Sequence, residues 1–394
     1  MRMKQDRLAL AMLLLASWAS APRVLVSSLD EVADRVIGQA GFTTGTLGLG
    51  PASLAVPQGA ALDEHGNLYV ADSGNNRVLE FNAPLTTGMS ASLVLGQPNL
   101  FTNTVGSPSD HTFDFPRAVA LDTQGDLYVA DSGNNRVLEF DAPLAPGGDT
   151  TADRVFGQPN MGSNSVVTPS ASSLNAHIDL ALDLQGHLYV ADSSYNRVLE
   201  YDMPLSNPSA NRVFGQPNLN SGALATPSDH SLSNPLGVAV DAQGDLYVAD
   251  TLNNRVLEYD APLTTGMAAS RALGQPGFNS VDPNFGGLSK GLDNPQMLAL
   301  DIFGDLYVAD FANNRVLVYD RPSASDLIAD RVFGQPGLSS GDPNHGGLGP
   351  ASLSSPTTPA LDALGDLYIA DYGNNRVLEY DALWDRLALP LVVR

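Results

Sequence analysis

The side chains that could perform chemistry in this chain are few and scattered. The 394 residues include six histidines and no cysteine, which excludes disulfides, thiolate metal sites and cysteine nucleophiles. His177 and Asp179 stand two residues apart and could bind a ligand together, but a catalytic zinc site usually needs three protein ligands. The two GxSxG strings, at 287–291 and 337–341, lie in Gly-rich loops and form no nucleophile elbow, and HExxH and P-loop motifs are absent. An enzyme would therefore depend on Asp and His alone, and a non-enzymatic role is favoured.

Other candidate ligand-binding residues occupy variable positions of long loops. Arg117 is a cation that could clamp a carboxylate, or could instead pair with Asp110 or Asp114 in its own loop. Exposed aromatic residues could anchor a peptide or a sugar, or could pack beneath their own loops. The further candidates are Tyr195, Phe285, Gln296, Phe311, His345 and Tyr372.

A sequence repeat indicates the elements that must position these residues. The segment LYVADSGNNRVLEF, which begins at Leu68, returns in similar form at spacings of 58 to 61 residues. The later copies begin at Leu127, Leu188, Leu246, Leu306 and Leu367. Each repeat contains four short runs rich in Val, Leu and Tyr and bounded by Gly, Asn, Asp or Pro, which is typical of β-strands. Four antiparallel strands repeated six times predict an all-β, six-bladed β-propeller.

The two ends of the repeat region indicate how the ring closes. The last repeat lacks the Gly-Gln-Pro strand that ends the other five, and residues 34–39 supply a spare copy before the first repeat. We expect this N-terminal strand to complete the last blade and remove two exposed sheet edges. A strand at 385–389 is the competing candidate. The expected organisation is a signal peptide (1–21), a linker (22–33), the propeller (34–382) and a C-terminal tail (383–394).

The first 21 residues resemble an export signal. Arg2, Lys4 and Arg7 precede an apolar run at 8–16, and small residues suited to cleavage follow. The run is shorter than the roughly 20 apolar residues that a membrane span needs, although a retained anchor is the alternative. We therefore expect a secreted or extracytoplasmic monomer with no membrane span after cleavage.

The repeated string D-x-x-G-x-LYVAD-xxx-N-R-V, as in residues 241–256, closely resembles the NHL repeat. The six copies together cover about 350 residues, and the resemblance implies a six-bladed propeller in a secreted, bacterial NHL-repeat protein. NHL propellers include protein-binding sensors, RNA-binding modules, adhesion domains and metal-dependent lyases, so the resemblance leaves function open. The lyases hold a metal with three channel histidines, and this chain shows no matching triad.

Residues that recur in every repeat are best explained by the blade itself. Asp72 stands five residues before Arg77, and we expect such pairs to hold each turn through charge-assisted hydrogen bonds. Asn76 suits a left-handed turn or caps backbone donors. The segment 72–76 could also bind a structural calcium ion, but it fails the EF-hand template. We expect no cofactor, with structural calcium or a channel metal as the alternatives.

The charge balance argues against a nucleic-acid partner. The chain has 20 basic and 43 acidic residues, for a formal net charge of -23. Most arginines belong to the repeated turns or begin the Gly-Gln-Pro strands, so too few remain for a basic stripe. We expect an extracellular binding or scaffold propeller that recognises a protein, peptide or carbohydrate on its loop-rich face. A metal-dependent lyase or lactonase-like hydrolase is the alternative.

Overall fold

The computed structural model describes residues 31–141, 143, 150–176, 179–202, 208–322 and 328–381. All of these residues belong to one compact unit, Glu31–Arg394. The expected signal peptide, His177 and the competing strand at 385–389 lie outside the described residues. Within the described ranges, no helix has the length and apolar character needed to cross a membrane.

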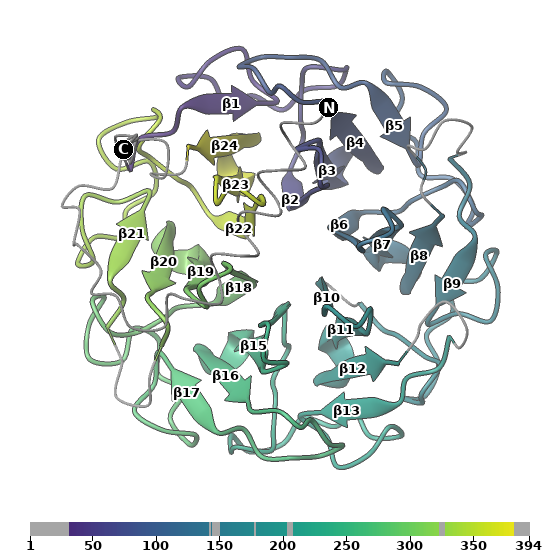
Figure 1. Cartoon of the computed structure of the whole chain (residues 1–394), viewed down its shortest axis with the longest axis vertical. Helices are drawn as coiled ribbons and strands as arrows, with labels where there is room; N and C mark the ends of the chain where they lie inside the picture. Colours follow the sequence, from purple (N-terminus) through teal and green to yellow (C-terminus); the bar gives the residue numbers. More distant parts are fainter. Residues whose placement is uncertain are drawn as a thin grey trace, which may run out of the picture. The chain divides into compact units, whose positions relative to one another are not determined.

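The described residues form six four-stranded antiparallel sheets, arranged as the blades of a six-bladed β-propeller (Figure 1). The predicted fold class is therefore confirmed. In every blade one strand lies beside the central axis and the others follow outward to the rim (Figure 1). Blade 1 contains β2 (Pro57–Leu62), β3 (Leu68–Asp72), β4 (Arg77–Phe81) and β5 (Leu93–Leu95). Blade 2 contains β6 (Pro116–Leu121), β7 (Leu127–Asp131), β8 (Arg136–Phe140) and β9 (Arg154–Phe156).

The remaining blades repeat this order of inner to outer strands. Blade 3 contains β10 (Leu180–Leu182), β11 (Leu188–Asp192), β12 (Arg197–Tyr201) and β13 (Arg212–Phe214). Blade 4 contains β14 (Gly237–Val240), β15 (Leu246–Asp250), β16 (Arg255–Tyr259) and β17 (Arg271–Leu273). Blade 5 contains β18 (Pro295–Leu300), β19 (Leu306–Asp310), β20 (Arg315–Tyr319) and β21 (Arg331–Phe333). Blade 6 contains β22 (Pro356–Leu361), β23 (Leu367–Asp371), β24 (Arg376–Tyr380) and β1 (Arg35–Ile37).

The N-terminal strand closes the ring. Strand β1 pairs antiparallel with β24, with Val36 opposite Leu378. Val36 and Ile37 are both 0% exposed, so the strand is part of the core rather than an addition to its surface. The predicted completion of the last blade by the N-terminal strand is confirmed, and β24 has no free edge.

The middle strands of each blade are buried on both faces. Every residue of β3 and of β4 is buried, although polar and apolar residues alternate in part of these strands. This burial arises because each blade packs between two neighbours, and the apolar side chains form six clusters along the ring. The consecutive apolar residues of LYVAD therefore mark a strand enclosed by two interfaces.

The ion pair predicted for each turn is confirmed and is completely buried. Arg77 Nε lies 2.7 Å from Asp72 Oδ2, and both side chains are 0% exposed. Its other nitrogens donate to backbone carbonyls of the flanking loops, at 2.6 Å to Leu100 and 2.9 Å to Gly50. The equivalent pairs in the other blades have the same geometry. Since every buried charge is paired and hydrogen-bonded, the repeated Asp and Arg are explained by blade architecture.

The repeated asparagine joins neighbouring blades. Asn76 follows the 3-10 turn η1 (Ser73–Asn75) in the left-handed conformation, with φ 52°. Its Oδ1 accepts the backbone N–H of Phe115 in blade 2 at 2.9 Å. The same contact spans the other five blade interfaces. Both predicted roles of this residue, the left-handed turn and the capping of a backbone donor, are therefore confirmed.

Candidate functional site

The long loops and the 3-10 turns lie together at one end of the blades. Asn76, at the turn between β3 and β4, donates from Nδ2 to the carbonyl of Asn103 in the loop before β6. Arg77 reaches the carbonyl of Leu100 in the same loop. We call this end the loop-rich face. Its single-copy residues, unlike the repeated ones, are free to differ from blade to blade.

Arg117 is placed on the loop-rich face at the start of β6. Its guanidinium lies 5.1 Å from the centre of the Phe115 ring. Asp110 lies 2.5 Å from His111, and the backbone N–H of Asp114 donates to Asp131. Within the described residues Arg117 has no carboxylate partner, and burial lowers the pKa of its guanidinium, against a smaller opposing effect of Tyr372. Arg117 is thus a partly desolvated cation without a counter-charge.

Two of the candidate aromatic residues form a pair. Phe311 begins the 3-10 turn η5 (Phe311–Asn313) and Tyr372 begins η6 (Tyr372–Asn374), in adjacent blades. Their ring centres lie 6.0 Å apart with planes at 64°, an edge-to-face contact. Both side chains are half-buried. Because Tyr372 is also an electrostatic neighbour of Arg117, the structure brings three of the candidates together.

Two of the remaining candidates are enclosed, and two are exposed in loops that are hydrogen-bonded to η5 and η6. Tyr195 is 8% exposed, donates its hydroxyl to the carbonyl of Val167 and contacts Arg197 with its ring. Gln296 is also buried and donates to Asn294 Oδ1 at 2.8 Å. Phe285 and the His345 side chain are 40% and 44% exposed, in the equivalent loops of blades 5 and 6.

Asp179 is buried beside the innermost strand of blade 3. It precedes β10, and its Oδ2 accepts the backbone N–H of Val238 in blade 4 at 2.9 Å. Burial raises the pKa of this carboxyl to about 7, although its backbone hydrogen bonds oppose the shift. Its predicted partnership with His177 stays a prediction, since His177 is outside the described residues.

Carboxylates gather instead at the opposite end of the blades. Among the described residues, four groups of three side chains have ligand atoms close enough to hold a metal ion, and the groups are equivalent in blades 2, 3, 4 and 6. In blade 2, however, Arg154 Nη1 lies 2.5 Å from Glu139 and 2.7 Å from Asp141. A guanidinium therefore stands where a metal would bind, and these groups fit an internal arginine better than a metal ion. The four groups are Asp126, Glu139 and Asp141; His187, Glu200 and Asp202; Asp245, Glu258 and Asp260; and Asp366, Glu379 and Asp381.

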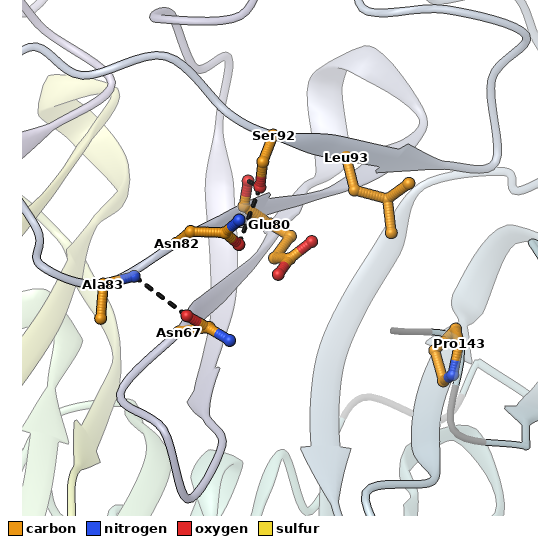
Figure 2. Close-up of a pocket in the computed structure, with 7 residues that line it drawn as sticks. All are labelled: Asn67, Glu80, Asn82, Ala83, Ser92, Leu93 and Pro143. Atoms are coloured by element: carbon orange, nitrogen blue, oxygen red, sulfur yellow. Dashed lines mark hydrogen bonds between the residues drawn. The ribbon is translucent and has the colours of Figure 1, made fainter. Parts of the chain in front are cut away.

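Blade 1 has a hollow at the position where these acidic groups lie in other blades. The hollow has a volume of about 530 Å³ (Figure 2). Its lining residues are Asn67, Glu80, Asn82, Ala83, Ser92, Leu93 and Pro143. The sequence alone does not predict this site. The available signal is that five of the six outermost strands begin with Arg, whereas Leu93 begins the outermost strand in blade 1.

A ring of six blades with buried Asp–Arg turns and a variable loop-rich face defines a repeat-built β-propeller. Three segments match the family model of the NHL repeat, at residues 54–81, 113–140 and 232–259. They correspond to the first three strands of blades 1, 2 and 4, and the other blades have the same strand order. The chain therefore contains NHL repeats at three positions of a six-bladed β-propeller.

Two curated proteins show similarity in sequence. The chain is 25% identical over 293 residues to Protein SUPPRESSOR OF QUENCHING 1, chloroplastic, of Arabidopsis thaliana, and 25% identical over 279 residues to Teneurin-1 of Caenorhabditis elegans. These alignments span 70% and 63% of this chain. They span only 26% and 9% of the two relatives, so most of each relative has no counterpart in the alignment.

Two solved enzyme structures align with the chain, and one of them shares its fold. A gluconolactonase from Xanthomonas campestris superimposes with a TM-score of 0.52 at 16% identity, covering 91% of this chain and 99% of the enzyme. A virginiamycin B lyase from Staphylococcus aureus gives a TM-score of 0.46 at 13% identity, covering 85% of this chain and 87% of the lyase. At such identities the similarity to the lactonase concerns the fold alone.

Proposed function

We propose that this chain is a non-enzymatic binding propeller that recognises a protein, peptide or glycan on its loop-rich face. The observation that supports this proposal is the position of Arg117, a cation without a carboxylate partner among the described residues, near the Phe311–Tyr372 pair. A ligand carboxylate would compensate the desolvated guanidinium through paired hydrogen bonds. The aromatic edges would add apolar contact beside it.

We also propose that binding takes place outside the cytoplasm. The support is the basic start, short apolar run and small residues of the first 21 positions. An excess of acidic over basic residues favours solubility in such a setting and disfavours anionic polymers as ligands.

A metal-dependent lyase or lactonase-like hydrolase is the second candidate. Asp179 favours it, because burial raises the pKa of this carboxyl to about 7, in the range that suits a general acid or base. The fold shared with a gluconolactonase is consistent with this alternative but does not distinguish it from binding.

The test is a binding screen of the purified chain against arrays of carboxylate-bearing peptides and acidic glycans. For the strongest hit, Arg117→Met should weaken binding by about tenfold or more, because it removes the charge and keeps much of the stem. The double variant Phe311→Ala/Tyr372→Ala should weaken it as well. Arg321→Met, which removes an exposed arginine elsewhere, is the matched control.

Two results would contradict the binding proposal. One is an array hit whose affinity is the same in the wild type, Arg117→Met and the aromatic double variant. The other is a stoichiometric metal ion in the purified chain together with turnover in a lactonase or lyase screen that Asp179→Asn abolishes. The second result would establish the enzyme alternative.

A further inference from the structure

In five blades an arginine lies opposite an acidic group at the end of the blade remote from the loop-rich face. It is the first residue of the outermost strand, and its cross-strand neighbour on the third strand is a glutamate in four of the five blades. In blade 6, for example, Arg35 Nη1 lies 2.5 Å from Glu379 and 2.6 Å from Asp381. The five arginines are Arg35, Arg154, Arg212, Arg271 and Arg331.

Blade 1 keeps the glutamate but lacks the arginine. Glu80 of β4 lies opposite Leu93 of β5, in the register that pairs Glu139 with Arg154 in blade 2. Leu93 packs against the apolar cluster between blades 1 and 2 and does not replace the guanidinium. The loss of the arginine therefore leaves a hollow beside a carboxylate (Figure 2).

The neighbouring charges change together with the arginine. Asn67 and Asn82 stand in blade 1 where Asp126 and Asp141 stand in blade 2, so two negative charges disappear along with the positive one. In blade 5 the glutamate position is Val318, and Arg331 pairs with Asp320 at 2.8 Å instead. In each of the other five blades an arginine thus pairs with at least one of these carboxylates, whereas Glu80 faces no arginine.

Glu80 is a buried carboxylate at the wall of an accessible hollow. Its side chain is 5% exposed, and burial raises its pKa, partly opposed by Ser92. Beside it, Tyr69 is the cross-strand neighbour of Glu80, is 0% exposed, and its hydroxyl has no hydrogen-bond partner in the described structure. In blade 6 the equivalent tyrosine, Tyr368, donates to Glu379 at 3.2 Å. In blade 1, the buried hydroxyl of Tyr69 beside Glu80 therefore lacks the hydrogen bond that its equivalent makes in blade 6.

We propose that the blade 1 hollow binds a guanidinium group, presented as an arginine side chain by another polypeptide, in the place that an internal arginine takes in the other five blades. A planar guanidinium matches a carboxylate with two parallel hydrogen bonds, and the Asn82 side-chain oxygen adds an acceptor at the rim. The volume of about 530 Å³ lies within the range of about 300–1,000 Å³ that is typical of ligand sites.

A divalent metal ion fits this hollow less well than a guanidinium. The lining offers one carboxylate, two amides, a hydroxyl and three apolar side chains. Calcium sites use six to eight oxygen ligands, commonly with several carboxylates. A single negative charge matches a monovalent organic cation instead.

The experiment measures binding of two peptides to the purified full chain by calorimetry. Acetyl-Gly-Arg-Gly-amide should bind saturably, and the citrulline analogue, which is neutral and of nearly the same shape, should not. Glu80→Gln should weaken binding of the arginine peptide by about tenfold or more, because it removes the carboxylate. Leu93→Arg should have the same effect, since the chain's own guanidinium then fills the hollow.

A second variant controls for added charge and for folding. Leu224→Arg adds the same charge at an exposed position outside the hollow and should bind the arginine peptide like the wild type. Leu93→Arg restores the residue type of the other blades and should keep or raise the melting temperature. The proposal is overturned if the arginine peptide fails to bind, if the citrulline peptide binds equally, or if binding survives both Glu80→Gln and Leu93→Arg unchanged. These outcomes do not depend on Arg117 and the loop-rich face.

Discussion

The guanidinium of Arg35 lies 2.5 Å from the carboxylate of Glu379, although the two residues stand at opposite ends of the propeller sequence. This contact belongs to the seam between β1 and β24, where the chain closes its own ring. A propeller opened at this seam would expose two sheet edges and the apolar side chains between them. Closure therefore makes the first described strand as important to stability as any strand within a blade.

The seam predicts a strong effect of N-terminal truncation. Deleting residues 22–40 removes Val36 and Ile37, both 0% exposed, and burial of each such side chain is worth about 1.5–3 kcal/mol. We expect a large decrease in the melting temperature measured by calorimetry. Deleting residues 383–394 is the control and should have little effect. The reverse pattern would assign closure to the C-terminal strand at 385–389.

The buried turns predict that a single arginine can be critical to the fold. Arg77→Met leaves the buried Asp72 carboxylate without its charge partner and removes the donor to several loop carbonyls, so we expect a loss of about 3–5 kcal/mol in the free energy of unfolding. The control is Asp110→Asn, which removes an exposed ion-pair partner of His111 and should cost about 1 kcal/mol or less. Urea denaturation gives both values. Equal, small effects would mean that the turns tolerate an unpaired buried charge.

Asn76 stabilises the interface between blades in two ways, through its side-chain hydrogen bond and through its left-handed backbone conformation. Asn76→Gly keeps the left-handed backbone but removes the acceptor for Phe115 N–H, and we expect a cost of about 1–3 kcal/mol. Asn76→Ala also places a Cβ atom in the left-handed region, which adds about 1–2 kcal/mol. The free energies of unfolding should therefore decrease from Asn to Gly to Ala. Equal stability of the Gly and Ala variants would show that backbone conformation contributes nothing at this position.

The acidic groups opposite the outer arginines predict an unusual pH dependence. Burial raises the pKa of Glu139 to about 8 and those of Glu200, Glu258 and Glu379 to about 7. The folded state therefore binds more protons than the unfolded state between the ordinary pKa, near 4.5, and these values. The stability from these groups is fully present below the ordinary pKa and is lost as the pH rises toward 8.

Melting temperatures measured between pH 5 and pH 8 test this sign. We expect the contribution of these glutamates to the stability of the folded state to decrease as the pH rises across that window. The window lies between their ordinary and raised pKa values. Glu139→Gln should make the slope of stability against pH shallower, because about one proton fewer is then taken up on folding. A slope identical in Glu139→Gln and the wild type would show that this carboxyl titrates normally.

Part of the candidate site could be predicted from the sequence. Positions that differ between repeats are not required by the blade structure and can serve binding instead. Arg117, Phe311 and Tyr372 could be recognised from the sequence in this way. Their proximity could not, because it depends on how the start of β6 and the turns η5 and η6 are placed in the folded ring. Tyr195 satisfied the same criterion, yet it is buried against the loop between β9 and β10, where its hydroxyl donates to Val167.

The sequence by itself determined the number of blades, the strands within them, the seam at residues 34–39 and the Asp72–Arg77 type of turn. These features follow from local patterns that recur six times, so each copy confirms the others. Only the tertiary structure decided which single-copy residues meet. The hollow beside Glu80 exists because β5 places Leu93 opposite a buried carboxylate, and such a cross-strand juxtaposition depends on register and packing rather than on neighbours in sequence.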